Sequence, residues 1–140
     1  MPHYRAEYRA AVKAAIAAEP RFRCFRAKSA WAQNIDPREL PVFGVATPRE
    51  PCSREGGTTV HRVTTVLIAL KRAGGDDVED ILDEDSIEIE RVVLPVLLAR
   101  AQIVALAMTE TFVNGEGSQR VGTLLMELTA TRFTDEGSED

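Results

Sequence analysis

The chain has 140 residues, of which 44% are hydrophobic and 28% are charged, and these values are typical of one globular domain with a buried core. It contains no run of about 18 apolar residues, and charged residues stand near its amino end, so we expect neither a membrane-spanning helix nor a signal peptide. The sequence therefore predicts a protein that is made in the cytosol.

The net charge of -5 hides a strong asymmetry along the chain. Residues 1–72 contain 13 Lys and Arg against 6 Asp and Glu, whereas residues 73–140 contain 4 against 16. If the two halves lie on different faces, the subunit is dipolar, which suits head-to-tail packing of identical subunits or attraction to a charged partner. The alternative is that the charges intermix in three dimensions and mainly provide solubility.

The amino-terminal third predicts one helix and two short strands. Tyr4 to Ala18 has one apolar face and ends before Pro20, so it predicts a helix, and we interpret its basic stripe as solvated rather than bound to nucleic acid. Phe22 to Trp31 alternates loosely, which favours a strand or an extended edge. Leu40 to Thr47 predicts a second strand, and Arg49 to Gly57 has the Pro, Ser, Gly and charged residues of an exposed loop.

The central stretch predicts a long strand and then an acidic helix. Thr58 to Lys71 is rich in Val, Ile, Leu and Thr, and both of its faces become apolar from Val66 onward, as in a covered strand. Gly74 and Gly75 allow the chain to reverse, and Asp76 or Asp77 is the predicted N-cap, with Asp76 and Glu79 as a capping box. The helix has one apolar stripe, interrupted by Asp85 at its centre: Val78, Ile81, Leu82, Ile89, Val92, Val93, Val96 and Leu97.

The carboxyl-terminal third predicts a hairpin. Pro95 predicts a kink or an end of the acidic helix, with at most a brief continuation through Leu98. Ile103 to Val113 is compatible with helix or strand, and its second half favours strand. Asn114 to Gly117 predicts a turn, and Gln119 to Phe133 predicts the last strand. The prediction is therefore an α+β fold over residues 1–134, with a mainly antiparallel sheet of four to five strands and two or more helices packed on it, followed by a disordered acidic tail at 135–140.

The carboxylates between Asp76 and Asp85 are the first candidate for chemistry. On a helix only every third or fourth carboxylate shares a face, so Asp76, Asp80 and Glu84 form a line and not a closed cage. The EF-hand pattern also fails, because Glu88 stands where that loop needs glycine. We rank a solvated face first, a basic protein partner second and a metal ion third.

No catalytic site is expected. Cys24 and Cys52 lack paired spacing, His3 and His61 complete no ligand set, and the common nucleophile, zinc and phosphate-loop motifs are absent. We therefore predict buried or idle thiols, no enzymatic activity, no cofactor and no metal ion.

The order of the parts resembles the tail terminator (minor tail) proteins of long-tailed phages and phage-like particles. The resemblance extends from about Tyr4 to Phe133 and is clearest in Asp76 to Val93 and in Glu116 to Gly122. After the amino-terminal helix, the segments that carry it are, in chain order, LPVFGVAT, a charged loop, HRVTTVLIAL, GGDDVEDILDEDSIEIERVV and TETFVNGEGSQRVGTLLMELTATRF.

The resemblance implies a structural protein, located in the tail of a virion or phage-like particle and assembled in the host cytoplasm. Such proteins form a ring, usually a hexamer, which caps the tail tube, ends its polymerisation and faces the head connector, while DNA passes through the ring without being read. Tube, connector and subunit contacts are then expected at the projecting charged segments: Arg49, Arg54, Glu55, Asp76, Asp80, Glu84, Glu116 and Arg120.

Two alternatives stay open. A head-closure or connector component of the same kind of particle has similar size and oligomeric habit. A small ligand-binding domain is the other, and its pocket would be sought beside His61 and Cys52.

Overall fold

The computed structural model describes residues 3–28, 37–116 and 119–137, and these form two helices and a six-stranded sheet. The prediction of an α+β fold with a mainly antiparallel sheet is confirmed, but the sheet has six strands and not four to five, because the segment Cys52–Gly56, predicted as a loop, also forms a strand. Every pair of neighbouring strands is antiparallel except the pair of Arg26–Lys28 and Val42–Arg49. In chain order the elements are α1 (Tyr4–Ala18), the 3-10 turn η1 (Pro20–Phe22), β1 (Arg26–Lys28), the 3-10 turn η2 (Pro37–Glu39), β2 (Val42–Arg49), β3 (Cys52–Gly56), β4 (Thr59–Gly74), α2 (Val78–Leu98), β5 (Ile103–Glu116) and β6 (Gln119–Asp135).

The pairing of β4 with β6 is the axis of the sheet. It runs from Thr59 opposite Asp135 to Gly74 opposite Arg120 without a shift in register. The strands lie in the order β1-β2-β4-β6-β5, and β3 pairs with the first part of β4. Because side chains alternate along a strand, this one long register fixes which residues of β4 and β6 face the helices.

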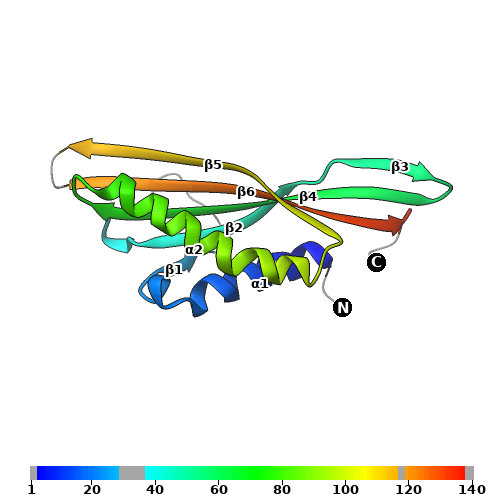
Figure 1. The fold of residues 1–140 in the computed structure, drawn as a ribbon, viewed down its shortest axis with the longest axis horizontal. Coiled ribbons are helices and arrows are strands. Elements are labelled where there is room, and N and C mark those ends of the chain that lie inside the picture. Colours follow the sequence, from blue (N-terminus) through cyan, green and yellow to red (C-terminus); the bar gives the residue numbers. More distant parts are fainter. Residues whose placement is uncertain (1–2, 29–36, 117–118, 138–140) are drawn as a thin grey trace.

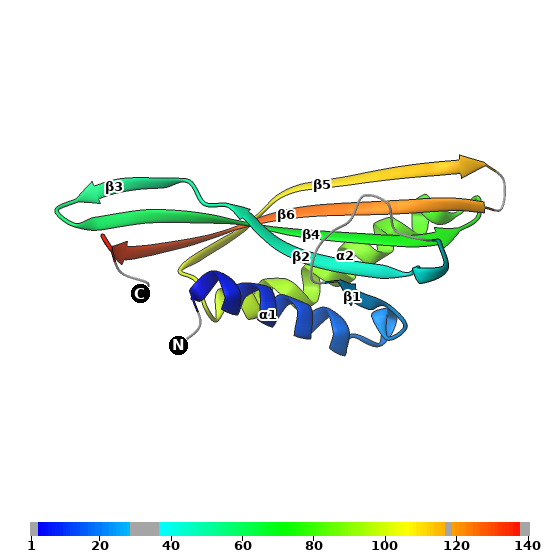
Figure 2. The same cartoon turned by 180° about the vertical axis from the view of Figure 1, so that it is seen from behind.

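Both helices pack on the same face of the sheet and cover only part of its length (Figures 1 and 2). Beyond them, β3, the first part of β4 and the end of β6 continue as a projecting three-stranded arm, which spans residues 52–63 and 131–135. The arm lies outside the helix layer.

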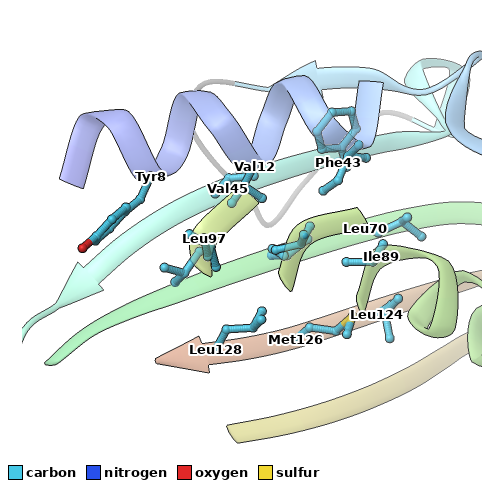
Figure 3. Close-up of a cluster of buried hydrophobic side chains, with 14 of the residues drawn as sticks. Tyr8, Val12, Phe43, Val45, Leu70, Ile89, Leu97, Leu124, Met126 and Leu128 are labelled. Atoms are coloured by element: carbon cyan, nitrogen blue, oxygen red, sulfur yellow. The ribbon is translucent and has the colours of Figure 1, made fainter. Parts of the chain in front are cut away.

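The core lies between the helices and the covered half of the sheet (Figure 3). The α1 side chains Tyr8, Val12 and Ile16 are fully buried, as the predicted apolar face requires. They meet side chains from both central strands and from α2 in one cluster that includes Phe43, Val45, Val66, Ile68, Leu70, Leu82, Ile89, Val93, Leu97, Leu124, Met126 and Leu128. Neither described helix combines the length and apolar composition that a bilayer span requires.

Several expected boundaries differ in the structure. Phe22 belongs to η1, the strand that comes after it covers only Arg26–Lys28, and residues 29–31 of the predicted strand lie outside the described residues. The predicted loop at Arg49 to Gly57 is instead the end of β2 and all of β3, because β4 supplies hydrogen-bonding partners for this polar segment. The long strand extends to Gly74, three residues past the predicted end.

The second helix and the tail also need correction. The N-cap of α2 is Asp77, whose side chain forms no capping hydrogen bond, so the predicted capping box of Asp76 and Glu79 is wrong. Pro95 does not end the helix, which continues to Leu98 as the brief continuation predicted. Asp135 ends β6 and the Glu136 backbone N–H donates to the Thr58 carbonyl at 2.6 Å, so the predicted disordered tail is ordered as far as Gly137. Residues 138–140 lie outside the described residues.

Candidate assembly surfaces

The eight predicted contact residues do not form one surface. Arg54 and Glu55 lie on the arm, whereas Asp76 and Arg120 meet at the opposite end of the sheet, with an Oδ1–Nη2 distance of 3.5 Å. Asp80 and Glu84 lie exposed on α2, Glu116 ends β5 opposite Gln119, and Arg49 pairs with Glu127 on the sheet at 3.2 Å. The structure therefore separates these charges into groups at the two ends and on the flank of the molecule.

The exposed apolar side chains are gathered elsewhere, on the edge strand β5. Eight large apolar side chains among the described residues are exposed, and five of them are on this one strand: Ile103, Leu106, Met108, Phe112 and Val113. β5 pairs only with β6, so its other edge has no strand beside it within the described part of the chain. An edge that presents both free backbone groups and apolar side chains is a ready surface for another chain.

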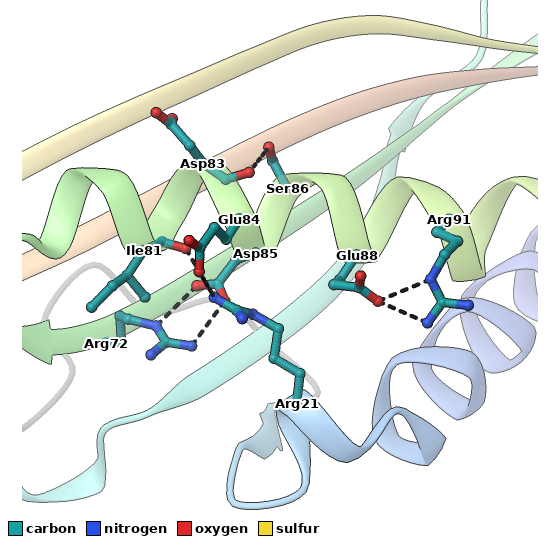
Figure 4. A network of polar contacts seen from close by, with 9 residues as sticks. All are labelled: Arg21, Arg72, Ile81, Asp83, Glu84, Asp85, Ser86, Glu88 and Arg91. Atoms are coloured by element: carbon teal, nitrogen blue, oxygen red, sulfur yellow. Dashed lines mark hydrogen bonds and ion pairs between the residues drawn. The ribbon is translucent and has the colours of Figure 1, made fainter.

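The charge asymmetry of the sequence is partly neutralised by ion pairs within the chain. Arg21, Arg49, Arg54 and Arg72 from the basic first half all form ion pairs with carboxylates of the acidic second half. The most buried of these links is at Asp85: its side chain is fully buried, and each of its two oxygens lies within ion-pair distance of an arginine (Figure 4). The Arg21 Nε lies 2.7 Å from Oδ1 and the Arg72 Nε lies 2.9 Å from Oδ2.

This arrangement explains why a carboxylate interrupts the apolar stripe of α2. Asp85 accepts hydrogen bonds from Arg21 Nε and Arg72 Nη2, and it thereby connects η1, β4 and α2. Arg72 also lies over the Phe25 ring, 5.0 Å from its centroid. A buried ion is tolerated only where such partners surround it, so Asp85 serves the fold and is not available to a metal ion or a partner.

A second polar cluster lies where the arm leaves the body. The Glu50 carboxylate accepts hydrogen bonds from the Tyr4 hydroxyl and, at 2.7 Å, from the Thr64 hydroxyl. Arg62 approaches it at 3.5 Å and also donates to the Thr134 hydroxyl at 2.7 Å. The cluster thus ties the amino end of α1 to β4 and β6 at the root of the arm.

The environment lowers the pKa of Glu50 below its ordinary value of 4.5. Burial by itself raises this pKa, but the hydrogen bonds from Tyr4 and Thr64 and the charges of Arg5 and Arg62 stabilise the carboxylate more strongly. The same burial, with Glu50 beside it, raises the pKa of the Tyr4 phenol.

Replacing Glu50 with glutamine is expected to lower the free energy of unfolding by about 0.5–1.5 kcal/mol at pH 7, the usual net worth of one lost hydrogen bond. Because the native pKa is the lower one, the carboxylate stabilises the fold above the unfolded value of about 4.5, and this contribution disappears as the pH falls through the native pKa. Urea unfolding of both proteins between pH 7 and pH 3 measures the effect. A difference that stays constant across this range contradicts the assignment.

The residues proposed to line a ligand pocket, His61 and Cys52, lie on opposite faces of the arm. Cys52 is in register with Arg62, while His61 is in register with Ser53 and stacks on Phe133 at 4.9 Å between ring centroids. Both thiols are free and exposed, so of the two predicted alternatives, buried or idle, the buried one is wrong, and that they are idle stays a prediction. Two open surface hollows of about 480 and 240 Å³ lie elsewhere, beside Arg100 and beside Arg21, and neither is lined by His61 or Cys52.

Within the described residues, no group of three or more His, Cys, Asp or Glu side chains is arranged to hold a metal ion. No protein-family model matches the chain, and no curated protein matches it in sequence. The function of the protein is therefore inferred from its fold, its exposed apolar edge and its charged groups.

Proposed function

We propose that this protein is a structural subunit that forms a ring at the end of a phage-like tail tube. The observation that carries the proposal is the concentration of exposed apolar side chains on the unpaired edge of β5. Monomeric proteins usually protect such an edge with charges, prolines or a covering element, whereas subunits of assemblies use it.

The shape of the subunit suits a ring more than a closed pair. The arm lies at one end of the sheet and the apolar edge of β5 lies along the other part, so the two projecting features differ in structure and position (Figure 1). Two unlike surfaces on one subunit allow heterologous contacts, which close into a ring when the rotation between subunits is right.

The order of the elements supports a tail-terminator role. An amino-terminal helix, three short strands, a long strand, an acidic helix and a closing hairpin succeed one another. The first helix, β2, the long strand, the acidic helix and the hairpin follow the order expected from the family that the sequence resembles. In that role the ring caps the tube, contacts the head connector and lets DNA pass. The exposed carboxylates Asp80 and Asp83 on α2 would repel DNA wherever they face the passage.

The decisive test is native mass spectrometry of the purified protein at low and high salt, followed by negative-stain imaging and addition to growing tail tubes. We expect a ring that caps the tubes and stops their growth. The double variant Met108→Asp and Phe112→Asp should lose the ring and remain a folded monomer, since it places charges on the apolar edge.

The matched control is Ile87→Asp, because Ile87 is also an exposed apolar residue, at 64%, but lies on α2 away from β5. This control should retain the ring. If the double variant assembles like the wild type, the β5 surface is not used. A ring that binds portal-bearing heads and leaves tubes uncapped would instead favour a head-closure component.

A further inference from the structure

We propose that β5 of one copy pairs with β3 of the next copy, so that the sheet continues from subunit to subunit. This inference rests on the proposed function and names the contact that would build the ring. Three features of the subunit support it: the free edges of the sheet, the charges beside them and the direction of the strands.

The β5 strand has the properties of an unprotected edge. Its 14 residues contain no proline, lysine or arginine, and one irregularity, between Leu106 and Met108, interrupts its pairing with β6. The apolar side chains are exposed on both of its faces: Leu106 lies opposite Leu128, which faces the helices, and Phe112 lies opposite Thr123 on the uncovered face. An incoming strand would therefore satisfy the backbone and cover apolar area on both faces.

Pairing of β5 with β5 of a second copy is unfavourable for electrostatic reasons. The side of α2 that lies toward β5 carries Asp83, which points to that strand in Figure 4, and Glu90 two turns later. An antiparallel β5–β5 pair has its twofold axis perpendicular to the sheet, so it would place two such acidic flanks side by side on the helix face, and Glu110 from each strand on the opposite, uncovered face. Like charges in this arrangement destabilise the contact.

The other available edge is β3. All five of its residues are exposed, and within the described residues it pairs only with β4. Arg54 of this strand lies opposite Val60, on the same face of the sheet as the helices, and its side chain is 60% exposed. Arg54 already pairs with Glu136 of its own chain, and in a continued sheet it also comes to the side on which the neighbour presents Asp83 and Glu90. The strand at the far edge, β1, has three residues within the described part of the chain and so offers a shorter ladder than β3.

The strand directions agree with this pairing. Three successive antiparallel steps, from β5 to β6, to β4 and to β3, make β3 antiparallel to β5 within one subunit. Copies in the same orientation would therefore form an antiparallel ladder, which is the more stable kind. Because β3 lies beyond the helices, pairing it with β5 shifts each copy along the strand direction relative to the copy before it. Copies shifted in this way close into a ring only if their strands are inclined to the ring axis.

Cross-linking through the native Cys52 tests the pairing. In a Cys24→Ser background, single cysteines are placed on the helix face of β5 by Leu106→Cys, Thr109→Cys, Thr111→Cys or Val113→Cys. Met108→Cys and Phe112→Cys on the other face are the matched controls. A disulfide needs Cα atoms within about 4.4–6.8 Å, so only cysteines that face Cys52 from the paired strand should react.

For one helix-face position, we expect oxidation to give a series of disulfide-linked multimers, and we expect these multimers to disappear when Cys52→Ser is added. Dimers that survive Cys52→Ser would show β5–β5 contact and overturn the proposal, as would equal reaction from both faces. If the wild type forms a ring but no cysteine variant gives disulfide-linked multimers, the strand pairing alone is rejected. If the multimers form but tail tubes are not capped, the tail function alone is rejected. A protein that stays monomeric at every concentration rejects both the strand pairing and the tail function.

Discussion

Replacing Asp85 by alanine is expected to lower the free energy of unfolding by about 3–5 kcal/mol, the usual effect of removing one partner from a buried ion pair. The side chain is fully buried, and two arginines direct their guanidinium groups at it from η1 and β4. Without the carboxylate, Arg21 and Arg72 are left close together with like charge and lose their shared acceptor. Equilibrium unfolding in urea, followed by circular dichroism, measures the change.

The neighbouring Glu84 provides the matched control. It contacts the same Arg21 at 3.4 Å, but its side chain is 68% exposed, so Glu84→Gln should change stability by less than about 1 kcal/mol. A variant in which Arg21, Arg72 and Asp85 are all replaced by apolar residues of similar size should recover part of the loss, because no unpaired charge then remains. An Asp85→Ala protein as stable as the wild type would show that water reaches the site and solvates the arginines.

The same residue shows what the sequence could and could not predict. The spacing of apolar residues predicted α2, and it marked Asp85 as a carboxylate inside an apolar stripe. It could not supply the partners, because Arg21 lies 64 residues away in the chain and Arg72 reaches Asp85 only once β4 and α2 have packed. Local periodicity specifies a face of a helix, whereas tertiary contacts decide what that face meets.

The arm shows the opposite difficulty. Cys52 to Gly56 has a polar composition that is typical of loops, yet it forms β3. Strand composition mainly reflects burial on at least one face, and all residues of this strand are exposed, so nothing in the segment selects apolar or β-branched side chains. The segment is a strand because it pairs with β4, and its own residues do not predict that pairing.

The candidate surface was missed for a related reason. The prediction placed contacts at charged, projecting segments, whereas the exposed apolar residues are on β5. Apolar residues on both faces of a strand are typical of a buried strand, and the sequence contains no signal that β5 lies at the edge of the sheet. Only the strand order shows that its apolar residues are exposed.

Replacing Gly122 by valine is expected to cost about 1–3 kcal/mol, because it overpacks the contact between β6 and the start of α2. A Cβ atom at Gly122 would lie 2.8 Å from Val78 Cγ2 and 2.9 Å from Leu82 Cδ1, and both of these side chains are buried. The helix must therefore move away from the sheet, or the two side chains must leave their preferred rotamers. Thermal unfolding monitored by the helical circular dichroism signal gives the loss.

A double variant separates steric overlap from a general loss of strand order. Leu82→Ala alone should cost about 2–5 kcal/mol by leaving a cavity, but the valine methyl groups of Gly122→Val can enter that cavity, so the double variant should lose less than the two single losses added together. Gly75→Ala is the control, since its nearest neighbour, Asp77 Oδ1, is 4.0 Å from the added carbon and no overlap is expected. If the stability losses of the two single variants are strictly additive, Gly122 is needed for the backbone conformation of β6 and not for the close approach of α2.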